Sequence, residues 1–183
     1  MAYKAVDAVD FAKGQSARYR DGQCWTLIED AVTGNGGKSS RGLTPNFSKV
    51  SSYVWGRPVT IADLQVGDVL QFSNYSWIRT VTVDVTRPDG SGTTDSKDTG
   101  AVRGKPQHSA IVSEVVSPGV VKAVEQNIPD GQGWVQVVEL VLLAPETRRE
   151  EVRQPTSKGD IVTVTTTTDV VKNPPKYYRP MDA

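Results

Sequence analysis

The chain has 183 residues, which suits one domain with a sizeable hydrophobic core. There are 21 Lys and Arg residues and 21 Asp and Glu residues, so the formal net charge is zero. Proteins that bind nucleic acids or anionic membranes usually carry an excess of basic residues, which this chain lacks. No stretch approaches the roughly 20 apolar residues of a membrane span, and the first residues lack the apolar core of a secretory signal. We therefore expect no nucleic-acid or membrane partner, and synthesis in the cytoplasm without a signal peptide.

The first third of the chain has the sequence patterns of helices. Apolar residues at a spacing of three predict an amphipathic helix over 3–18, and a second helix is predicted over 24–32, before a glycine-rich stop at 34–37. A short helix is expected within 45–54 and a single helical turn over 60–64. All of these segments precede the first predicted strand.

After position 64 the hydrophobic period changes to two, which predicts strands. The expected strands are 69–72, 77–87, 108–116, 120–126, 134–143 and 161–171. Two polar segments, 88–100 and 145–158, are expected to be a glycine-rich loop and an exposed connection. Helices followed by antiparallel strands predict an α+β fold, in a single domain that spans 1–183.

The only cysteine, Cys24, follows a glycine turn at the predicted start of a helix. The free N–H groups and the dipole of a helix N-terminus lower the pKa of a thiol and can bind a developing oxyanion. Cys24 is therefore a candidate nucleophile, and the alternative is a buried, inert cysteine that acts as a small hydrophobic residue. One cysteine forms no internal disulfide, and one cysteine with one histidine excludes a Cys/His zinc site, so no metal or cofactor is expected.

The only histidine, His108, stands at the head of the predicted strand 108–116. If Cys24 has an imidazole base, that base must be His108. The alternative is an ordinary surface histidine.

Two polar residues close the next predicted strand. On a strand, Glu125 and Asn127 point to the same face and Gln126 points to the other. Either Glu125 or Asn127 could orient His108 through its second ring nitrogen, as in the Cys-His-Asn form of the catalytic triad. The alternative is that the strand ends at Glu125 and all three side chains face solvent.

Five short motifs follow one another along the chain. They are Gly22-Gln23-Cys24-Trp25, Gly67-Asp68-Val69-Leu70-Gln71-Phe72, His108-Ser109-Ala110-Ile111-Val112, Glu125-Gln126-Asn127 and Tyr178-Arg179-Pro180. In this order the motifs resemble those of CHAP domains, the cysteine- and histidine-dependent amidohydrolases and peptidases related to NlpC/P60 proteins. The resemblance covers about residues 5 to 180.

The resemblance implies a papain-like or NlpC/P60-like fold, in which N-terminal helices carry the nucleophile at a helix N-terminus and pack on an antiparallel sheet. It implies that Cys24 is the nucleophile and His108 the base. It implies Glu125 as the partner of the histidine, with Asn127 as a competing or assisting candidate. Gln23 would then lie near the oxyanion hole, beside the backbone N–H of Cys24.

The implied reaction is cleavage of amide bonds in peptidoglycan stem peptides, by an amidase or an endopeptidase, without a cofactor. Such an enzyme would reach the wall as an endolysin released with a holin, or as an effector delivered by a secretion system. Two other functions stay open: the same thiol chemistry on a non-wall amide or protein substrate, and a catalytically silent binding module of CHAP type.

The chain departs from the family pattern in two places. Gln107 precedes the histidine where the family usually has glycine, and an insertion over about 73–106 separates the Gly-Asp strand from the histidine strand. The insertion is expected to be either a flap that shapes the substrate cleft or a plain decoration of the sheet edge.

Overall fold

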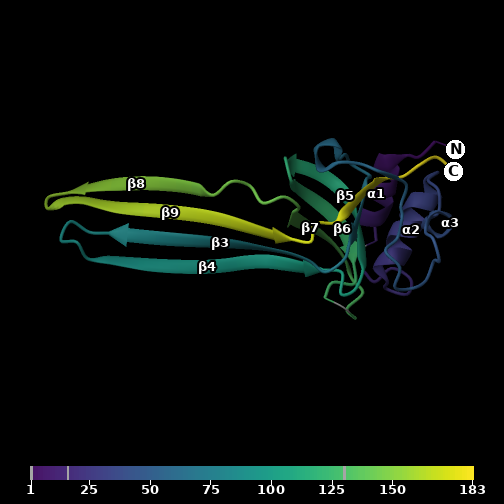
Figure 1. Cartoon of the computed structure of the whole chain (residues 1–183), viewed down its shortest axis with the longest axis horizontal. Coiled ribbons are helices and arrows are strands. Elements are labelled where there is room, and N and C mark those ends of the chain that lie inside the picture. Colours follow the sequence, from purple (N-terminus) through teal and green to yellow (C-terminus); the bar gives the residue numbers. More distant parts are fainter. Residues whose placement is uncertain (1, 16, 130) are drawn as a thin grey trace.

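The computed structural model describes residues 2–15, 17–129 and 131–183, and it contains two antiparallel sheets. The first sheet lies beside the helices, and the second projects away from them to one side (Figure 1). The first sheet has the order β1-β10-β2-β5-β6-β7 and the second has the order β4-β3-β9-β8.

The bounds of the elements are as follows. The helices are α1 (Ala5–Lys13), α2 (Cys24–Gly34) and α3 (Ser40–Leu43), with a 3-10 turn, η1 (Ile61–Asp63). The first sheet holds β1 (Arg57–Pro58), β2 (Val69–Phe72), β5 (His108–Ser117), β6 (Val120–Gln126), β7 (Val135–Val141) and β10 (Lys176–Arg179). The second holds β3 (Tyr75–Thr86), β4 (Gly92–Arg103), β8 (Arg148–Thr156) and β9 (Gly159–Lys172).

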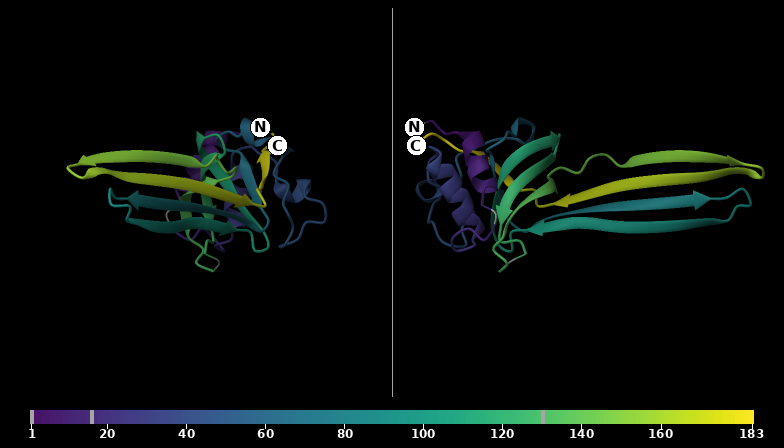
Figure 2. Two further views of the ribbon diagram at one scale, coloured as in Figure 1. Left: turned by 60° about the vertical axis from the view of Figure 1, so that its left-hand side comes forward. Right: turned by 180° about the vertical axis from the view of Figure 1, so that it is seen from behind.

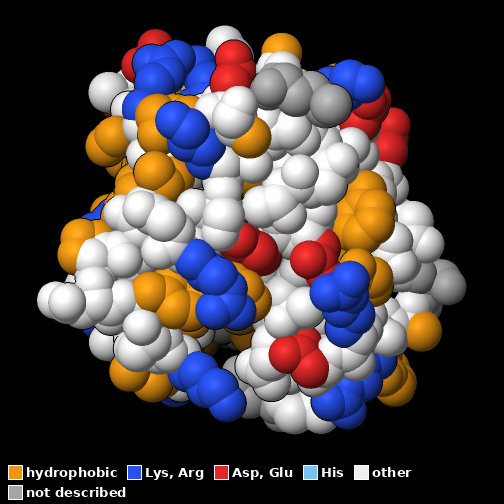
Figure 3. Space-filling view, turned by 90° about the vertical axis from the view of Figure 1, so that its right-hand side faces the viewer, with side chains coloured by type: hydrophobic (Ala, Val, Ile, Leu, Met, Phe, Trp, Pro, Cys, Tyr) orange, Lys and Arg blue, Asp and Glu red, His pale blue; other side chains and the backbone are white. Residues whose placement is uncertain are grey.

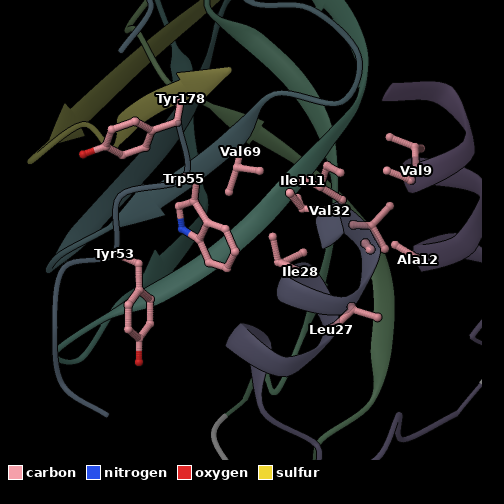
Figure 4. Close-up of a cluster of buried hydrophobic side chains, with 13 residues drawn as sticks. Val9, Ala12, Leu27, Ile28, Val32, Tyr53, Trp55, Val69, Ile111 and Tyr178 are labelled. Atoms are coloured by element: carbon pink, nitrogen blue, oxygen red, sulfur yellow. The ribbon is translucent and has the colours of Figure 1, made fainter. Parts of the chain in front are cut away.

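Helices α1 and α2 pack on one face of the first sheet, and their apolar stripes form the larger part of that core (Figure 4). The buried contributors are Ala8, Val9, Ala12, Leu27, Ile28, Ala31, Val32, Val69, Ile111 and Val124. The other face of the sheet buries a second cluster, which includes Leu70, Phe72, Ala110, Val112 and Leu140. Each fully buried Val, Leu, Ile or Phe side chain among them contributes about 1.5–3 kcal/mol to folding.

The second sheet forms a long projection, called the arm below, that consists of β3, β4, β8 and β9. In all three views it extends away from the helices (Figures 1 and 2). Its outer strands, β4 and β8, are exposed along almost their whole length and carry charged side chains, a pattern that protects open sheet edges from pairing with other chains. The insertion 73–106 is thus one half of a sheet that the segment 148–172 completes.

The arm is joined to the first sheet by buried contacts at its base. The Tyr75 hydroxyl donates a hydrogen bond of 2.7 Å to the Val141 carbonyl oxygen, and the Tyr75 ring lies 5.1 Å from the Phe72 ring. Arg79 of β3 forms an ion pair of 2.9 Å with the buried carboxylate of Asp169 of β9. These contacts fix where the two hairpins of the arm leave the sheet.

The Gly-Asp and Arg-Pro motifs meet in one ion pair. The Arg179 guanidinium donates from Nε and from one terminal nitrogen to the two carboxylate oxygens of Asp68, each at 2.9 Å. Gly67 precedes this aspartate at φ +88, and a Cβ there would lie 2.8 Å from the Ala5 Cα, so the turn needs glycine to let α1 approach. The pair therefore fastens the C-terminal strand to the start of β2.

The expected α+β, papain-like fold class is wrong, because the chain is mostly β. Strands account for 47% of the chain and helices for 15%, and they form two antiparallel sheets with few helices. The error came from the two polar segments: 88–100 lies largely within β4, and 145–158 contains β8. Both strands are exposed on both faces, so their sequences lack the alternation that marks a half-buried strand.

Most of the other predicted helices and strands are present in the structure, and two of the predicted helices are not as expected. The helix at 24–32, the turn at 60–64 and the six predicted strands are present. The first helix is shorter than expected, since it covers only Ala5–Lys13, and the helix expected within 45–54 is absent, while a short helix forms just before it at Ser40–Leu43. No helix within the described residues is long and apolar enough to cross a membrane.

We predict that Arg179→Met destabilises the protein by about 3 kcal/mol, because it leaves the buried Asp68 carboxylate without its cation. A matched control is Arg153→Met, which removes an exposed ion pair with Glu151 in the arm and should cost less than about 1 kcal/mol. Urea unfolding midpoints of the two variants and the wild type measure both effects. Equal losses in the two variants would contradict the structural role assigned to Arg179.

Candidate active site

Cys24 is the first residue of α2 and is partly exposed. Gln23, the residue before it, has extended backbone angles (φ −86, ψ 138), which suit a helix N-cap. Gly22 has φ +80, and a Cβ there would lie 2.5 Å from the Arg18 Nε, so the glycine allows this turn to close before the helix. The backbone N–H groups of the first helical turn have no partner within the helix. The thiol accepts backbone hydrogen bonds from Trp25 of that turn and from Ser109 of β5.

His108 lies beside Cys24 and is almost fully buried, with 3% of its surface exposed. Burial raises the pKa of the Cys24 thiol, but hydrogen bonding to His108 and the charge on that ring outweigh burial and hold the pKa below 9.0. Burial lowers the pKa of His108, while hydrogen bonds to Cys24 and Glu125 raise it to about 9. The two shifts together favour a thiolate–imidazolium pair at neutral pH.

Glu125 is the partner of the histidine in this structure. Its carboxylate oxygen lies 3.0 Å from His108 Nε2, and the whole side chain is buried. Because Glu125 engages Nε2, Nδ1 is the ring nitrogen left for the thiol. Burial raises the pKa of Glu125, but hydrogen bonds from His108 and Arg103 lower it below its ordinary value.

Asn127 does not join this group. It follows the last residue of β6, with φ 72, and its side-chain oxygen accepts a hydrogen bond of 2.9 Å from the Gly131 N–H. It therefore shapes the turn toward β7. Of the two candidates for orienting His108, the geometry places only Glu125 in contact.

Gln23 lies next to Cys24, but no contact fixes its side chain in an oxyanion site. Its backbone N–H donates to the Asp21 carboxylate at 3.0 Å, and its carbonyl accepts from the Gln126 side chain at 2.9 Å. Gln126 also accepts from the Tyr19 N–H at 2.8 Å, so it ties the loop before α2 to β6. The side chain of Gln23 is exposed and lines a cleft, and its role at the oxyanion stays a prediction.

Sequence reasoning missed Arg103 and Gln136, which hold Glu125. Arg103 is the last residue of β4, and its guanidinium donates to both carboxylate oxygens of Glu125, at 2.7 and 2.6 Å. Gln136 of β7 donates to the same carboxylate at 3.0 Å. No motif marks Arg103, because it lies in the insertion and its partner is 22 residues further along the chain.

A buried amide network positions the strand that carries His108. The Gln71 side-chain oxygen accepts hydrogen bonds from Trp55 at 3.0 Å and from the Ser109 hydroxyl at 2.8 Å. The nitrogen of Gln71 donates to Gln107 at 3.2 Å, so the glutamine that replaces the expected glycine is part of this network. Polar side chains buried in this way are costly unless paired, and here they are paired.

A cleft of about 520 Å³ opens beside Cys24. Its lining residues are Asp21, Gln23, Trp25, Thr26, Arg41, Phe47, Lys49 and Tyr53. A volume of this size accommodates a small peptide. Within the described residues, no group of three or more His, Cys, Asp or Glu side chains is arranged to hold a metal ion.

No protein-family model matches the chain, and neither does any curated protein or solved structure. The class of protein is therefore inferred from the arrangement of the site. A thiol at a helix N-terminus, an imidazole beside it and a buried carboxylate behind the imidazole are the groups that a thiol hydrolase would use as nucleophile, base and orienting group.

We predict that Cys24 reacts with iodoacetamide as a thiolate over an unusually broad pH range. As the pH falls, the alkylation rate should fall with the protonation of the Cys24 thiol, whose pKa lies below 9.0 because His108 stabilises the thiolate. As the pH rises, the ion pair should persist until His108 loses its proton near pH 9. In His108→Asn the thiol should return to its ordinary pKa, so the rate at pH 7 should fall about tenfold per unit of pKa regained. Identical profiles for both proteins would rule out the pair.

We predict different effects for substitutions of Glu125, which lies in β6, and of Asn127, which follows the end of β6. Glu125→Gln should lower turnover by roughly 100-fold or more, because a neutral amide no longer holds the histidine tautomer and its charge. Asn127→Ala should change turnover by less than about threefold, with a small loss of stability from the weakened turn. Initial rates measure the turnover of both variants, and thermal unfolding measures their stability. An equal loss of turnover in the two variants would contradict the role of Glu125 as the residue that orients His108.

Proposed function

We propose that this protein is a cysteine hydrolase that cleaves amide bonds through an acyl-enzyme on Cys24. The observation that carries the proposal is the line of side chains from Cys24 through His108 to the fully buried Glu125, which begins at a helix N-terminus beside a cleft. Burying a carboxylate behind an imidazole costs free energy of desolvation. Such an arrangement is typical of catalytic sites, and an inert binding module does not require it.

The chemistry follows from the positions of the groups. The Cys24 thiolate attacks the carbonyl carbon of the amide, and the free N–H groups at the start of α2 stabilise the oxyanion. The His108 imidazolium then gives its Nδ1 proton to the leaving amine, and the acyl group stays on sulfur. In the second half, neutral His108 takes a proton from water, which attacks the thioester and releases the acid.

Glu125 acts throughout by holding the imidazole. Its hydrogen bond to Nε2 fixes the ring so that Nδ1 faces the sulfur, and its negative charge stabilises the imidazolium between the two steps. Arg103 keeps the carboxylate ionised and in place.

Peptidoglycan stem peptides are the proposed substrate. The support is the ordered set of motifs that resembles CHAP domains, and the structure adds a physical reason for two of them, since Asp68 and Arg179 form one ion pair. The site chemistry itself requires only a peptide-like amide that fits the cleft.

The test is turnover of purified peptidoglycan by the wild type, Cys24→Ala and His108→Ala, with mass spectrometry of the released fragments. We expect release by the wild type alone, with a loss of at least about 1,000-fold in each variant, and the fragments identify the bond. Arg153→Met, far out in the arm, is the matched control and should retain full activity. Release that persists in Cys24→Ala would overturn the cysteine mechanism.

If the wild type releases no fragments while its Cys24 still alkylates rapidly at neutral pH, the proposed substrate is wrong and the nucleophile stands. If Cys24 reacts no faster than a free thiol, the hydrolase proposal itself fails and a binding module is favoured.

A further inference from the structure

Arg41 lies in the cleft beside the nucleophile, and its exposed side chain stacks against two aromatic rings that also contact each other. Its guanidinium carbon is 4.4 Å from the centre of the Trp25 ring and 4.7 Å from the centre of the Phe47 ring. Trp25 directly follows Cys24, and its own orientation is fixed by a hydrogen bond of 2.9 Å to the Ser40 hydroxyl. The position of the guanidinium is therefore set in advance, relative to the thiol.

The hydrogen-bonding capacity of this guanidinium is unused. Within the described part of the chain, the Arg41 side chain has neither a carboxylate nor a carbonyl partner. The backbone N–H of Arg41, by contrast, donates a hydrogen bond to the Ser39 hydroxyl. An arginine fork that is stacked but unpaired is suited to a planar anion, which it can bind through two parallel hydrogen bonds. The buried or half-buried arginines Arg79, Arg103 and Arg179 already hold carboxylates in this way, whereas the exposed Arg41 holds none.

The cleft has the charge of a site for a single anion. Arg41 and Lys49 supply two cations and Asp21 one anion, which leaves a positive excess suited to one carboxylate rather than to a phosphate dianion. On the face that carries α2 and α3, Lys and Arg side chains lie directly beside hydrophobic ones (Figure 3). Apolar walls of this kind strengthen the attraction between an anion and a nearby cation.

Tyr53 links the cationic end of the cleft to the nucleophile. Burial raises the pKa of its hydroxyl, the charge on Cys24 raises the pKa further, and the charge on Arg41 lowers it. The hydroxyl is thus within electrostatic reach of both groups. Because Arg41 stacks on Trp25, the residue that follows Cys24, an anion bound by Arg41 would lie in the cleft beside the nucleophile.

We propose that the cleft binds a free carboxylate carried by the amide substrate, through Arg41 with Lys49 in support. This inference rests on the proposed function, since it names the chemical class of the substrate for that same site: an amide with a carboxylate one or two residues from the bond that is cut. Neutral amides of the same shape are poorer substrates, because they leave the guanidinium unpaired.

The test uses two alkylating reagents that differ only in charge, iodoacetate and iodoacetamide. The ratio of their rate constants toward Cys24 is measured at pH 7 in the wild type, Arg41→Gln and Lys49→Gln. The imidazolium of His108 attracts iodoacetate equally in all three proteins, so the change in ratio isolates the cleft. Arg57→Gln, an exposed arginine in a different hollow, is the control.

We expect the ratio to fall about fivefold in Arg41→Gln and less in Lys49→Gln, near the upper end of what an exposed charge pair contributes. Arg57→Gln should leave it unchanged, Arg41→Lys should restore part of it, and added salt should lower it in the wild type. An unchanged ratio in Arg41→Gln overturns the carboxylate site. That failure is distinct from failure of the hydrolase proposal, which would appear as slow reaction of Cys24 with the neutral reagent in every protein.

Discussion

Glu125 carries a charge that has no access to solvent, and the surrounding structure is arranged to compensate it. An uncompensated carboxylate in such a position would cost several kcal/mol. Three groups share the compensation: the fork of Arg103, the imidazole of His108 and the side-chain amide of Gln136. They come from β4, β5 and β7 and converge on a residue of β6, so the position of one carboxylate depends on strands of both sheets.

The base of the arm is therefore part of the candidate site, although most of the arm lies far from the helices. Arg103 is the last residue of β4, and Tyr75, the first residue of β3, is bonded to β7. A chain with one cysteine has no disulfide, and three arginine–carboxylate pairs join its distant segments instead: Asp68 with Arg179, Arg79 with Asp169, and Arg103 with Glu125. Pairs of this kind fix register and specificity more than they add net stability.

The sequence was informative where one face of an element is buried. The stripe in α2, the alternation in the sequence of β3 and the continuous apolar runs of β5 and β6 reflect burial on one or both faces. The Gly-Gln-Cys turn placed the thiol at a helix start. Sequence reasoning failed for β4 and β8, whose side chains face solvent along almost their whole length, so no apolar alternation marks these strands. The class prediction failed with them, since these strands shift the balance from α+β to mostly β.

Within the site, local periodicity could not separate Glu125 from Asn127. The strand ends at Gln126, and Asn127 turns away at positive φ, a change that one or two residues decide. Arg103 was beyond reach for a different reason: its role depends on a contact between segments in two sheets, and neither segment carries a local mark of it. Contacts of that kind require knowledge of the tertiary structure.

The Arg103–Glu125 pair differs from the other two arginine–carboxylate pairs, Arg179–Asp68 and Arg79–Asp169, in a way that bears on the proposed reaction. Only Glu125 shares its carboxylate with a group that changes charge during the proposed reaction. When His108 gives its proton to the leaving amine, the imidazole becomes neutral and Glu125 loses one of its two cationic partners. Without Arg103, the buried carboxylate would then have no cationic partner, and its desolvation would add to the barrier of that step. Because Arg103 remains bound through both oxygens, the histidine can alternate between its two protonation states while Glu125 stays ionised and in place.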